Sequence, residues 1–143
     1  MDVDFKLIIS GLGFFISLMS FGMAYSAKKE AKQTIILDLI HKKRMMLTEH
    51  FSEVLRVDRA LRNETIDDAD ISGIYEQLVE YKNQLIQAMN ESSETLVSIK
   101  SLDKKTLLNE ISDNSLMYTI HKVQIIELEN YIANKSKKKT AET

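Results

Sequence analysis

The feature that most constrains the fold of this chain is an uncharged, mostly apolar run close to its N-terminus. Leu7 to Tyr25 reads LIISGLGFFISLMSFGMAY, nineteen residues without a charged side chain. As an α-helix this run is about 28 Å long, close to a hydrocarbon layer of about 30 Å. The sequence therefore predicts a transmembrane helix over residues 7–25, called the membrane segment below, preceded by a short extracytoplasmic N-terminus at residues 1–6.

The charges that flank the membrane segment predict its orientation. Two aspartates and one lysine precede it, whereas three lysines follow it closely. Lysine and arginine are retained on the cytoplasmic side during insertion. We therefore expect a single-pass signal-anchor with its N-terminus outside and its C-terminal domain in the cytoplasm, and a compact chain without cysteine suits a bacterial inner (cytoplasmic) membrane. The residues that determine this topology are Lys28, Lys29 and Lys32.

Two other interpretations of the membrane segment remain open. Ala24-Tyr25-Ser26 has the small-x-small form that signal peptidase accepts, and cleavage before Ala27 would release a secreted helical bundle. An acidic rather than basic start and a long apolar run favour the anchor over the signal peptide. A buried core helix is less favoured because Ser10 is the only polar residue between Leu7 and Phe15, so no solvent face is marked.

Small residues follow one stripe along the membrane segment and just beyond it, at alternating steps of three and four. Helices in lipid associate through close backbone approach and hydroxyl hydrogen bonds, and both need small side chains on one face. Glycine and serine are also common in transmembrane helices that have no partner. We interpret the stripe as an interface, either with a second copy in a homo-oligomer or with another membrane protein. This small-residue stripe consists of Ser10, Gly13, Ser17, Ser20, Ala24, Ala27 and Ala31.

The rest of the chain is predicted to be all-α. It contains no proline, and only one of the four glycines lies outside the membrane segment, so long helices are expected. The polar stretch Asn63–Asp70 is rich in capping residues and predicts the first turn. Helices at about 27–62, 70–100 and 102–134 have nearly matched lengths and short connections, which predicts an antiparallel three-helix bundle over 26–134. The lysine-rich residues 135–143 are expected to form a disordered basic tail.

Apolar residues recur at helical spacing in each predicted helix. Their period is nearer 3.6 than 3.5, which disfavours a parallel coiled-coil stalk as the alternative to the bundle. Residues 28–62 carry net charge +4 and residues 63–100 carry −6, so the first helix is expected to pair with the second. The expected core positions are Ile36, Leu39, Ile40, Leu47, Phe51, Val54, Leu55 and Leu61, then Ile74, Tyr75, Leu78, Leu85, Ile86, Met89, Leu96 and Val97, then Leu107, Leu108, Ile111, Met117, Ile120, Leu128, Tyr131 and Ile132.

The sequence offers no catalytic or metal-binding motif. It has no cysteine, and it lacks a phosphate-binding glycine loop. His41, His50 and His121 do not have metal-ligand spacing. A net charge of −2 gives no reason to expect nucleic acid as a partner. We therefore expect no enzyme activity, no cofactor and no metal.

These observations favour a membrane-anchored helical scaffold or regulator that associates through its transmembrane helix and docks a cytoplasmic protein through its bundle. An exposed apolar patch on the second or third helix would support docking, because a spacer needs none. The alternative is a membrane-perturbing effector of a bacterial toxin or anti-phage defence system. In that case the hydroxyls of Ser10, Ser17 and Ser20 would line an oligomeric pore.

Overall fold

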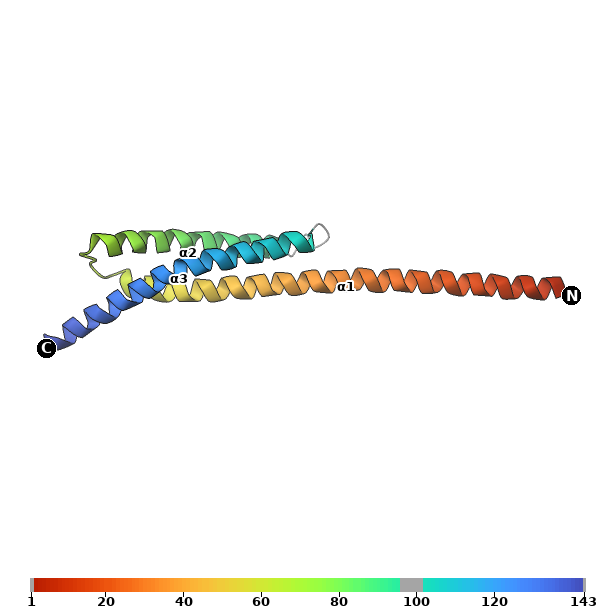
Figure 1. Cartoon of the computed structure of the whole chain (residues 1–143), viewed down its shortest axis with the longest axis horizontal. Coiled ribbons are helices and arrows are strands. Elements are labelled where there is room, and N and C mark those ends of the chain that lie inside the picture. The colour runs from red at the N-terminus through yellow and green to blue at the C-terminus, as the bar shows by residue number, and fades with distance from the viewer. Residues whose placement is uncertain (1, 96–101, 143) are drawn as a thin grey trace.

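The described part of the chain is all-helical. The computed structural model describes residues 2–95 and 102–142, and the side chains of residues 8–92 and 102–142. Three helices cover nearly all of these residues: α1 (Asp2–Leu61), α2 (Ala69–Thr95) and α3 (Lys104–Ala141). Each helix packs against the other two, and α2 runs opposite to α1 and α3 (Figure 1). The all-α class and the three-helix arrangement predicted from the sequence are confirmed.

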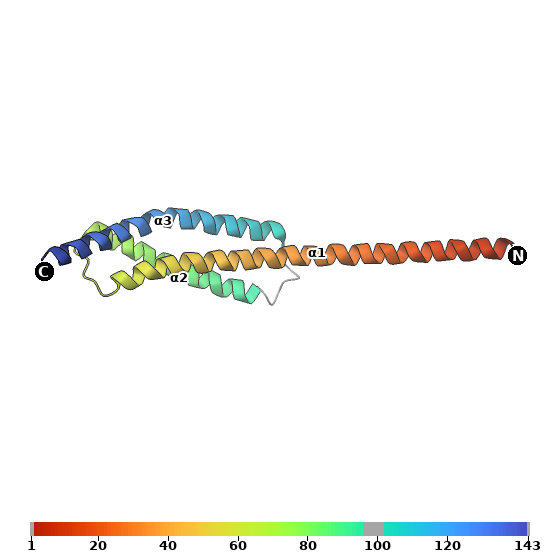
Figure 2. The ribbon, with the colours of Figure 1, turned by 90° about the horizontal axis from the view of Figure 1, so that it is seen from below.

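α1 is one uninterrupted helix of 60 residues. It joins the membrane segment to the first bundle helix, as expected from the absence of proline in the chain and of glycine between residues 23 and 61. α2 and α3 flank only its C-terminal half, and its N-terminal half extends far beyond them (Figures 1 and 2). The molecule is therefore a three-helix bundle with a single long helix projecting from one end.

Capping explains where α2 begins. The backbone N–H groups of Asp70 and Ile71 donate to Asp68 Oδ1 at 2.9 and 3.4 Å, which satisfies donors that the first helical turn leaves free. Asp103 stands at the start of α3 in an extended conformation, but its side chain makes no capping hydrogen bond. Residues 96–100 of the second predicted helix lie outside the described residues.

The C-terminal residues differ from the prediction. α3 continues to Ala141, so residues 135–141 are helical and not a disordered tail. The helix is held here by Lys135, whose Nζ lies 3.0 Å from a carboxylate oxygen of Glu64, and by Lys139, at 3.4 Å. The polar stretch Ser112–Ser115 lies inside α3, which continues through it.

The core lies along one side of α1. The buried positions of α1 recur every three or four residues. This spacing differs from the period near 3.6 residues that the apolar residues of the sequence suggested. A helix that packs on two neighbours keeps this spacing when it coils gently around them. The main core cluster contains Leu47, Val54, Val57, Leu61, Leu78, Tyr81, Leu85, Ile125 and Leu128, and a smaller one at the end toward the membrane segment contains Ile36, Ile40 and Leu107.

Several expected core positions are wrong. Ile86, Leu108, Met117 and Ile120 are exposed. Apolar residues occur on more than one side of α3, and a pattern of apolar spacing does not reveal which side faces the neighbours. The predicted set also omitted Val57, Tyr81 and Ile125, all of which are buried; the expected positions Leu96 and Val97 lie outside the described residues.

The charge pairing between helices also differs from the prediction. Basic residues of α1 pair with α3, as in Lys43 with Glu110 at 2.7 Å. The ion pair that joins α1 to α2 in the described residues has the reverse polarity, with Asp58 on α1 and Lys82 on α2. Net charge per segment is a poor guide here because exposed pairs contribute little and buried geometry decides which charges meet.

Candidate interaction surfaces

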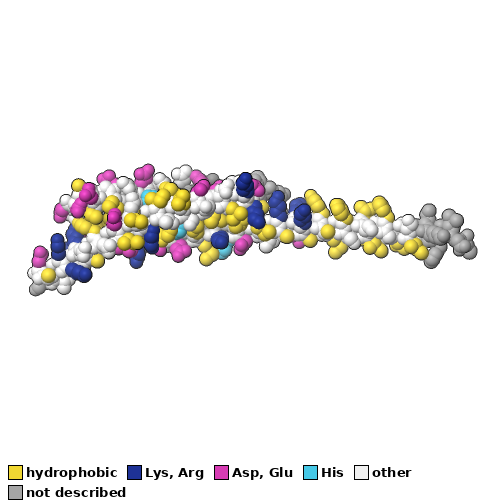
Figure 3. Space-filling view, viewed as in Figure 1, with side chains coloured by type: hydrophobic (Ala, Val, Ile, Leu, Met, Phe, Trp, Pro, Cys, Tyr) yellow, Lys and Arg dark blue, Asp and Glu magenta, His cyan; other side chains and the backbone are white. Residues whose placement is uncertain are grey.

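The membrane segment has no protein cover in this structure. From Ile8 to Tyr25 every large apolar side chain is more than half exposed, and Figure 3 shows this apolar surface on the projecting part of α1. By length and composition, α1 is the one helix in the described part of the chain that is able to cross a membrane. A continuous apolar surface of this size needs a partner or a lipid environment.

The small-residue stripe is exposed along its whole length, from Ser10 to Ala31. Apart from the nearby backbone of its own helix, a Cβ atom added to Gly11, Gly13 or Gly22 would meet no described atom within 4 Å. Contacts within one chain therefore give no reason for glycine at these positions. The role of the stripe as an interface stays a prediction.

Lys28, Lys29 and Lys32 lie between the membrane segment and the part of α1 that belongs to the bundle. All three are exposed, and they follow Tyr25 and precede Ile36, the first buried core residue. Basic side chains gather at this junction in Figure 3. The spacing places them in the headgroup region if the apolar run spans the bilayer.

α3 carries an apolar surface on the side opposite the core. We call this the outer face of α3: Leu116, Ile120, Val123 and Ile126, with Val123 60% exposed. Val123 and the buried Ile125 are two residues apart, which is about 200° around a helix. Ile120 was predicted to lie in the core from its apolar spacing, and this surface was not predicted.

Two acidic residues bound the outer face of α3. Asp113 lies one turn before Leu116, and Glu127 one turn after Val123, both exposed. Among the described residues neither takes part in an ion pair. The surface therefore has an apolar centre with a negative charge at each end.

α1 also has an outer face in its bundle half. It is a shallow open groove lined by His41, Arg44, Met45, Thr48 and Glu49, and the exposed Ser52 follows it one turn later. Met45, 61% exposed, provides its apolar centre. When the spacing of the small-residue stripe is continued past Ala31, it reaches Met45, Thr48 and Ser52.

Asp58 holds α1 to α2 from inside the bundle. Its carboxylate is 2% exposed and accepts hydrogen bonds from Arg62 at 2.6 Å, Tyr75 at 2.8 Å and Lys82 at 2.9 Å. Burial raises the pKa of Asp58, but these donors outweigh burial and hold it at about 2. Burial and the bond to Asp58 raise the pKa of Tyr75 to about 12.

Two stacked histidine–tyrosine pairs hold α3. The ring of His50 on α1 lies 3.7 Å from that of Tyr118, and Tyr81 on α2 lies 4.0 Å from His121. His50 is 6% exposed, its Nδ1 has no hydrogen-bond partner, and burial lowers its pKa. Tyr118 also donates to Glu53 at 2.6 Å. These contacts pack α3 against both α1 and α2.

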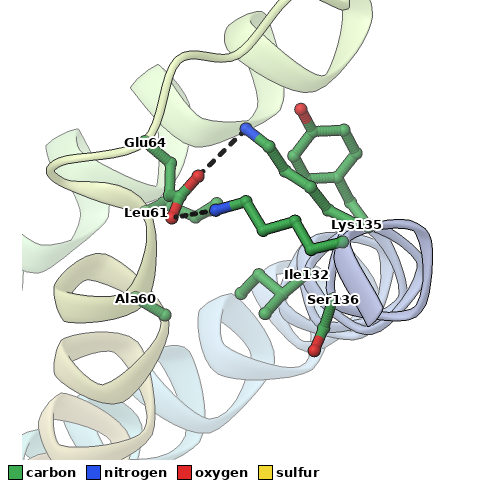
Figure 4. A pocket seen from close by; sticks show the side chains of 8 residues that line it. Ala60, Leu61, Glu64, Ile132, Lys135 and Ser136 are labelled. Carbon is green, nitrogen blue, oxygen red and sulfur yellow. Dashed lines mark hydrogen bonds and ion pairs between the residues drawn. The ribbon is translucent and has the colours of Figure 1, made fainter. Parts of the chain in front are cut away.

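The end of the bundle far from the membrane segment has a small pocket of about 180 Å³. Glu64 reaches across it toward Lys135 and Lys139, beside Ile132 and Ser136 (Figure 4). Hydrogen bonds from Lys135 and Lys139 lower the pKa of Glu64. Ligand sites usually measure about 300 Å³ or more. No group of His, Asp or Glu in the described residues has the arrangement of a metal site.

Comparison of the chain with protein-family models, curated proteins and solved structures finds no match.

Proposed function

We propose that this chain is a membrane-anchored helical scaffold or regulator that acts through its surfaces and performs no catalysis. The observation that carries the proposal is the uncovered outer face of α3. A helix that served only as a spacer would have polar residues where Leu116, Ile120 and Val123 are exposed. The bundle therefore presents an apolar surface that a protein can cover.

The projecting half of α1 supports anchoring in a membrane. None of the most apolar stretch of α1 is buried within the chain, whereas a core helix of a soluble domain has at least one covered side. The nineteen uncharged residues match the thickness of a hydrocarbon layer. The three lysines at the junction favour a cytoplasmic bundle.

Chemical crosslinking of the full-length protein in native membranes, followed by mass determination, tests the proposal. Crosslinked multiples of the 16.4 kDa chain, or a product with one other polypeptide, would support it. A soluble product without residues 1–26 would contradict it and indicate a cleaved signal peptide.

A pair of variants identifies the face of the membrane segment that associates. Gly13→Leu together with Ser17→Leu places bulk on the small-residue stripe and is expected to abolish association, because backbones no longer approach closely. Phe14→Leu is the matched control, since Phe14 is highly exposed and lies off the stripe. An equal loss of association in the double variant and in the Phe14→Leu control would show that the stripe is not the interface.

A second candidate, the membrane-perturbing effector, is favoured by one observation. Ser10, Ser17 and Ser20 all lie on the exposed stripe, so an oligomer can direct their hydroxyls toward a common axis. Dye leakage from expressing cells separates the candidates. A scaffold leaves the membrane tight, whereas the effector releases dye, and Ser17→Ala would slow that release without preventing assembly.

A further inference from the structure

Contacts within the bundle fix which residues of α1 and α3 lie at the same position along the bundle axis. We call this position the height of a residue. The two helices run in the same direction (Figure 1), and a residue of α1 lies level with the residue of α3 that is 67 to 73 positions later. The contacts that establish this are Lys43 with Glu110, His50 with Tyr118, Glu53 with Lys122, and Arg56 with Glu129. Val123 is accordingly within one helical turn of the height of Ser52.

If neighbouring copies are anchored in one membrane, the same match of heights between α1 and α3 also holds from one copy to the next. All copies then have the same orientation, and the same residue lies at the same distance from the bilayer in each. Two copies in contact meet at equal heights, so the outer face of α3 on one copy is level with the α1 groove of the next. This step rests on the anchoring proposed above.

Charges on the two outer faces are complementary at equal heights. Asp113 is level with position 45 of α1, next to Arg44, and Glu127 is level with position 56, one turn before Arg59. Both arginines are exposed, and neither takes part in an ion pair among the described residues. Contact between unlike faces therefore places both acids of α3 within side-chain reach of an arginine of the neighbour.

Contact between like faces would oppose charges of the same sign. Two copies related by a twofold axis along the membrane normal would place Asp113 against Asp113 and Glu127 against Glu127 across α3. Across α1 they would place Arg59 against Arg59 and Asp38 against Asp38. Juxtaposed like charges disfavour an interface, so the charge pattern selects contact between unlike faces.

Two polar side chains on the groove side of this contact are already hydrogen-bonded within their own helix. The hydroxyls of Thr48 and Ser52 already donate to carbonyls of their own helix, at 2.8 and 2.9 Å. They need no water to satisfy their donors, and the groove presents the Thr48 methyl beside Met45. Leu116 and Ile120 reach this groove at matching heights, which places apolar side chains of one copy against those of the next.

We propose that neighbouring copies of this chain dock through unlike faces, with the outer face of α3 of one copy packed in the α1 groove of the next. Such a head-to-tail contact is heterologous, and repetition in the membrane plane produces a ring or an open row. Each copy uses both faces, so the same contact can repeat from copy to copy.

Single cysteines provide the test, because the chain has no natural cysteine. Ser52→Cys and Val123→Cys are introduced into chains that carry tags of different mass, and both sites are exposed and lie within one helical turn of the same height. Full-length chains are treated in membranes with a short thiol crosslinker. We expect a mixed product when both variants are expressed together and none when either is expressed alone. A product from Val123→Cys alone, or from Ser52→Cys alone, would show a contact between like faces and overturn the proposal.

Charge exchange provides a second measurement. Asp113→Arg is expected to reduce the mixed product about tenfold, the effect of about 1.4 kcal/mol, and Arg44→Asp in the other chain is expected to restore it. Glu76→Arg on α2 is the matched control, an exposed acid away from both faces. Loss without restoration by Arg44→Asp would overturn the proposed pairing.

A third cysteine separates failure of this inference from failure of the proposed function. Ala24→Cys lies on the small-residue stripe and reports association of the membrane segments. Crosslinking at position 24 without the mixed product at 52 and 123 would refute the contact between unlike faces and leave a self-associating anchor in place. Chains recovered in the soluble fraction would refute both proposals.

Discussion

The two halves of α1 have opposite relations to their surroundings. In the bundle half, apolar residues such as Leu47 and Val54 are fully covered by α2 and α3. In the projecting half, apolar residues such as Phe14 and Phe21 are among the most exposed large apolar side chains in the described part of the chain. One helix thus contains a segment built to pack against protein in water and a segment whose composition suits lipid. Substitutions in the two halves should therefore have different kinds of effect.

The largest expected effect lies in the bundle half. Asp58→Ala leaves Lys82 and Tyr75 without their buried acceptor, and removing one partner of a buried ion pair costs about 3–5 kcal/mol. We expect a decrease of that size in the free energy of unfolding, measured by chemical denaturation of the full-length protein in detergent. Asp38→Ala, an exposed acid on the same helix, is the control. A decrease below about 1 kcal/mol for Asp58→Ala would show that the cluster contributes little.

A charge in the projecting half should affect insertion and leave the bundle unchanged. Phe14→Lys places an ammonium group near the middle of the membrane segment, where lysine disfavours insertion by about 2.5–3.5 kcal/mol. We expect a loss of protein from the membrane fraction, with unchanged unfolding of the bundle. Met45→Lys, in the bundle half, should remain in the membrane fraction. Full membrane retention of Phe14→Lys would argue against a spanning helix.

Acidification should weaken the bundle in two steps. The pKa of Asp58 is lowered from 3.8 to about 2, so its stabilisation is present above pH 3.8 and is lost as the pH falls toward 2. At 1.36 kcal/mol per pKa unit, this contribution is about 2 kcal/mol. The pKa of His50 is also lowered, so the unfolded chain binds a proton first, and stability declines as the pH falls below 6.5.

Unfolding measured from pH 8 to pH 3 tests this order. His50→Phe keeps a flat ring against Tyr118 and is expected to remove the decline below pH 6.5, while the decline near pH 3.8 remains. Glu53, whose pKa is lowered by its bonds from Lys122 and Tyr118, contributes to the acidic step in both proteins. An unchanged profile in His50→Phe would exclude His50 as the source of the first step.

The fold was more predictable than the surfaces. An absence of proline, scarce glycine and apolar periodicity are local properties, and they gave three helices with approximate ends. Which side of a helix faces its neighbours depends on tertiary contacts, so Ile120 was assigned to the core although it is exposed. The continuation of α3 through residues 135–141 was missed because its charges suggested a solvated tail, and the contacts of Lys135 and Lys139 with Glu64 involve residues far apart in the sequence.

The small-residue stripe, in contrast, is a surface that the sequence predicts and that the structure does not test. Its spacing is local and was readily recognised, but a single chain does not test it, since the stripe is exposed and no contact among the described residues explains Gly13. The candidate surfaces on α1 and α3 required the structure, because the height match between Ser52 and Val123 depends on how the two helices pack.

The smallest expected effect distinguishes the two sides of α3. Val123→Ser removes an exposed apolar group and should change the free energy of unfolding by less than about 0.5 kcal/mol, as is usual for surface positions. Leu128→Ala, on the buried side of the same helix, should cost about 2–5 kcal/mol. Chemical denaturation of both variants in detergent checks the difference. If Val123→Ser leaves unfolding unchanged but reduces crosslinking between copies, the outer face serves association and not folding. If unfolding falls by several kcal/mol, Val123 is covered within the folded chain, and the outer face of α3 is not free to bind a neighbour.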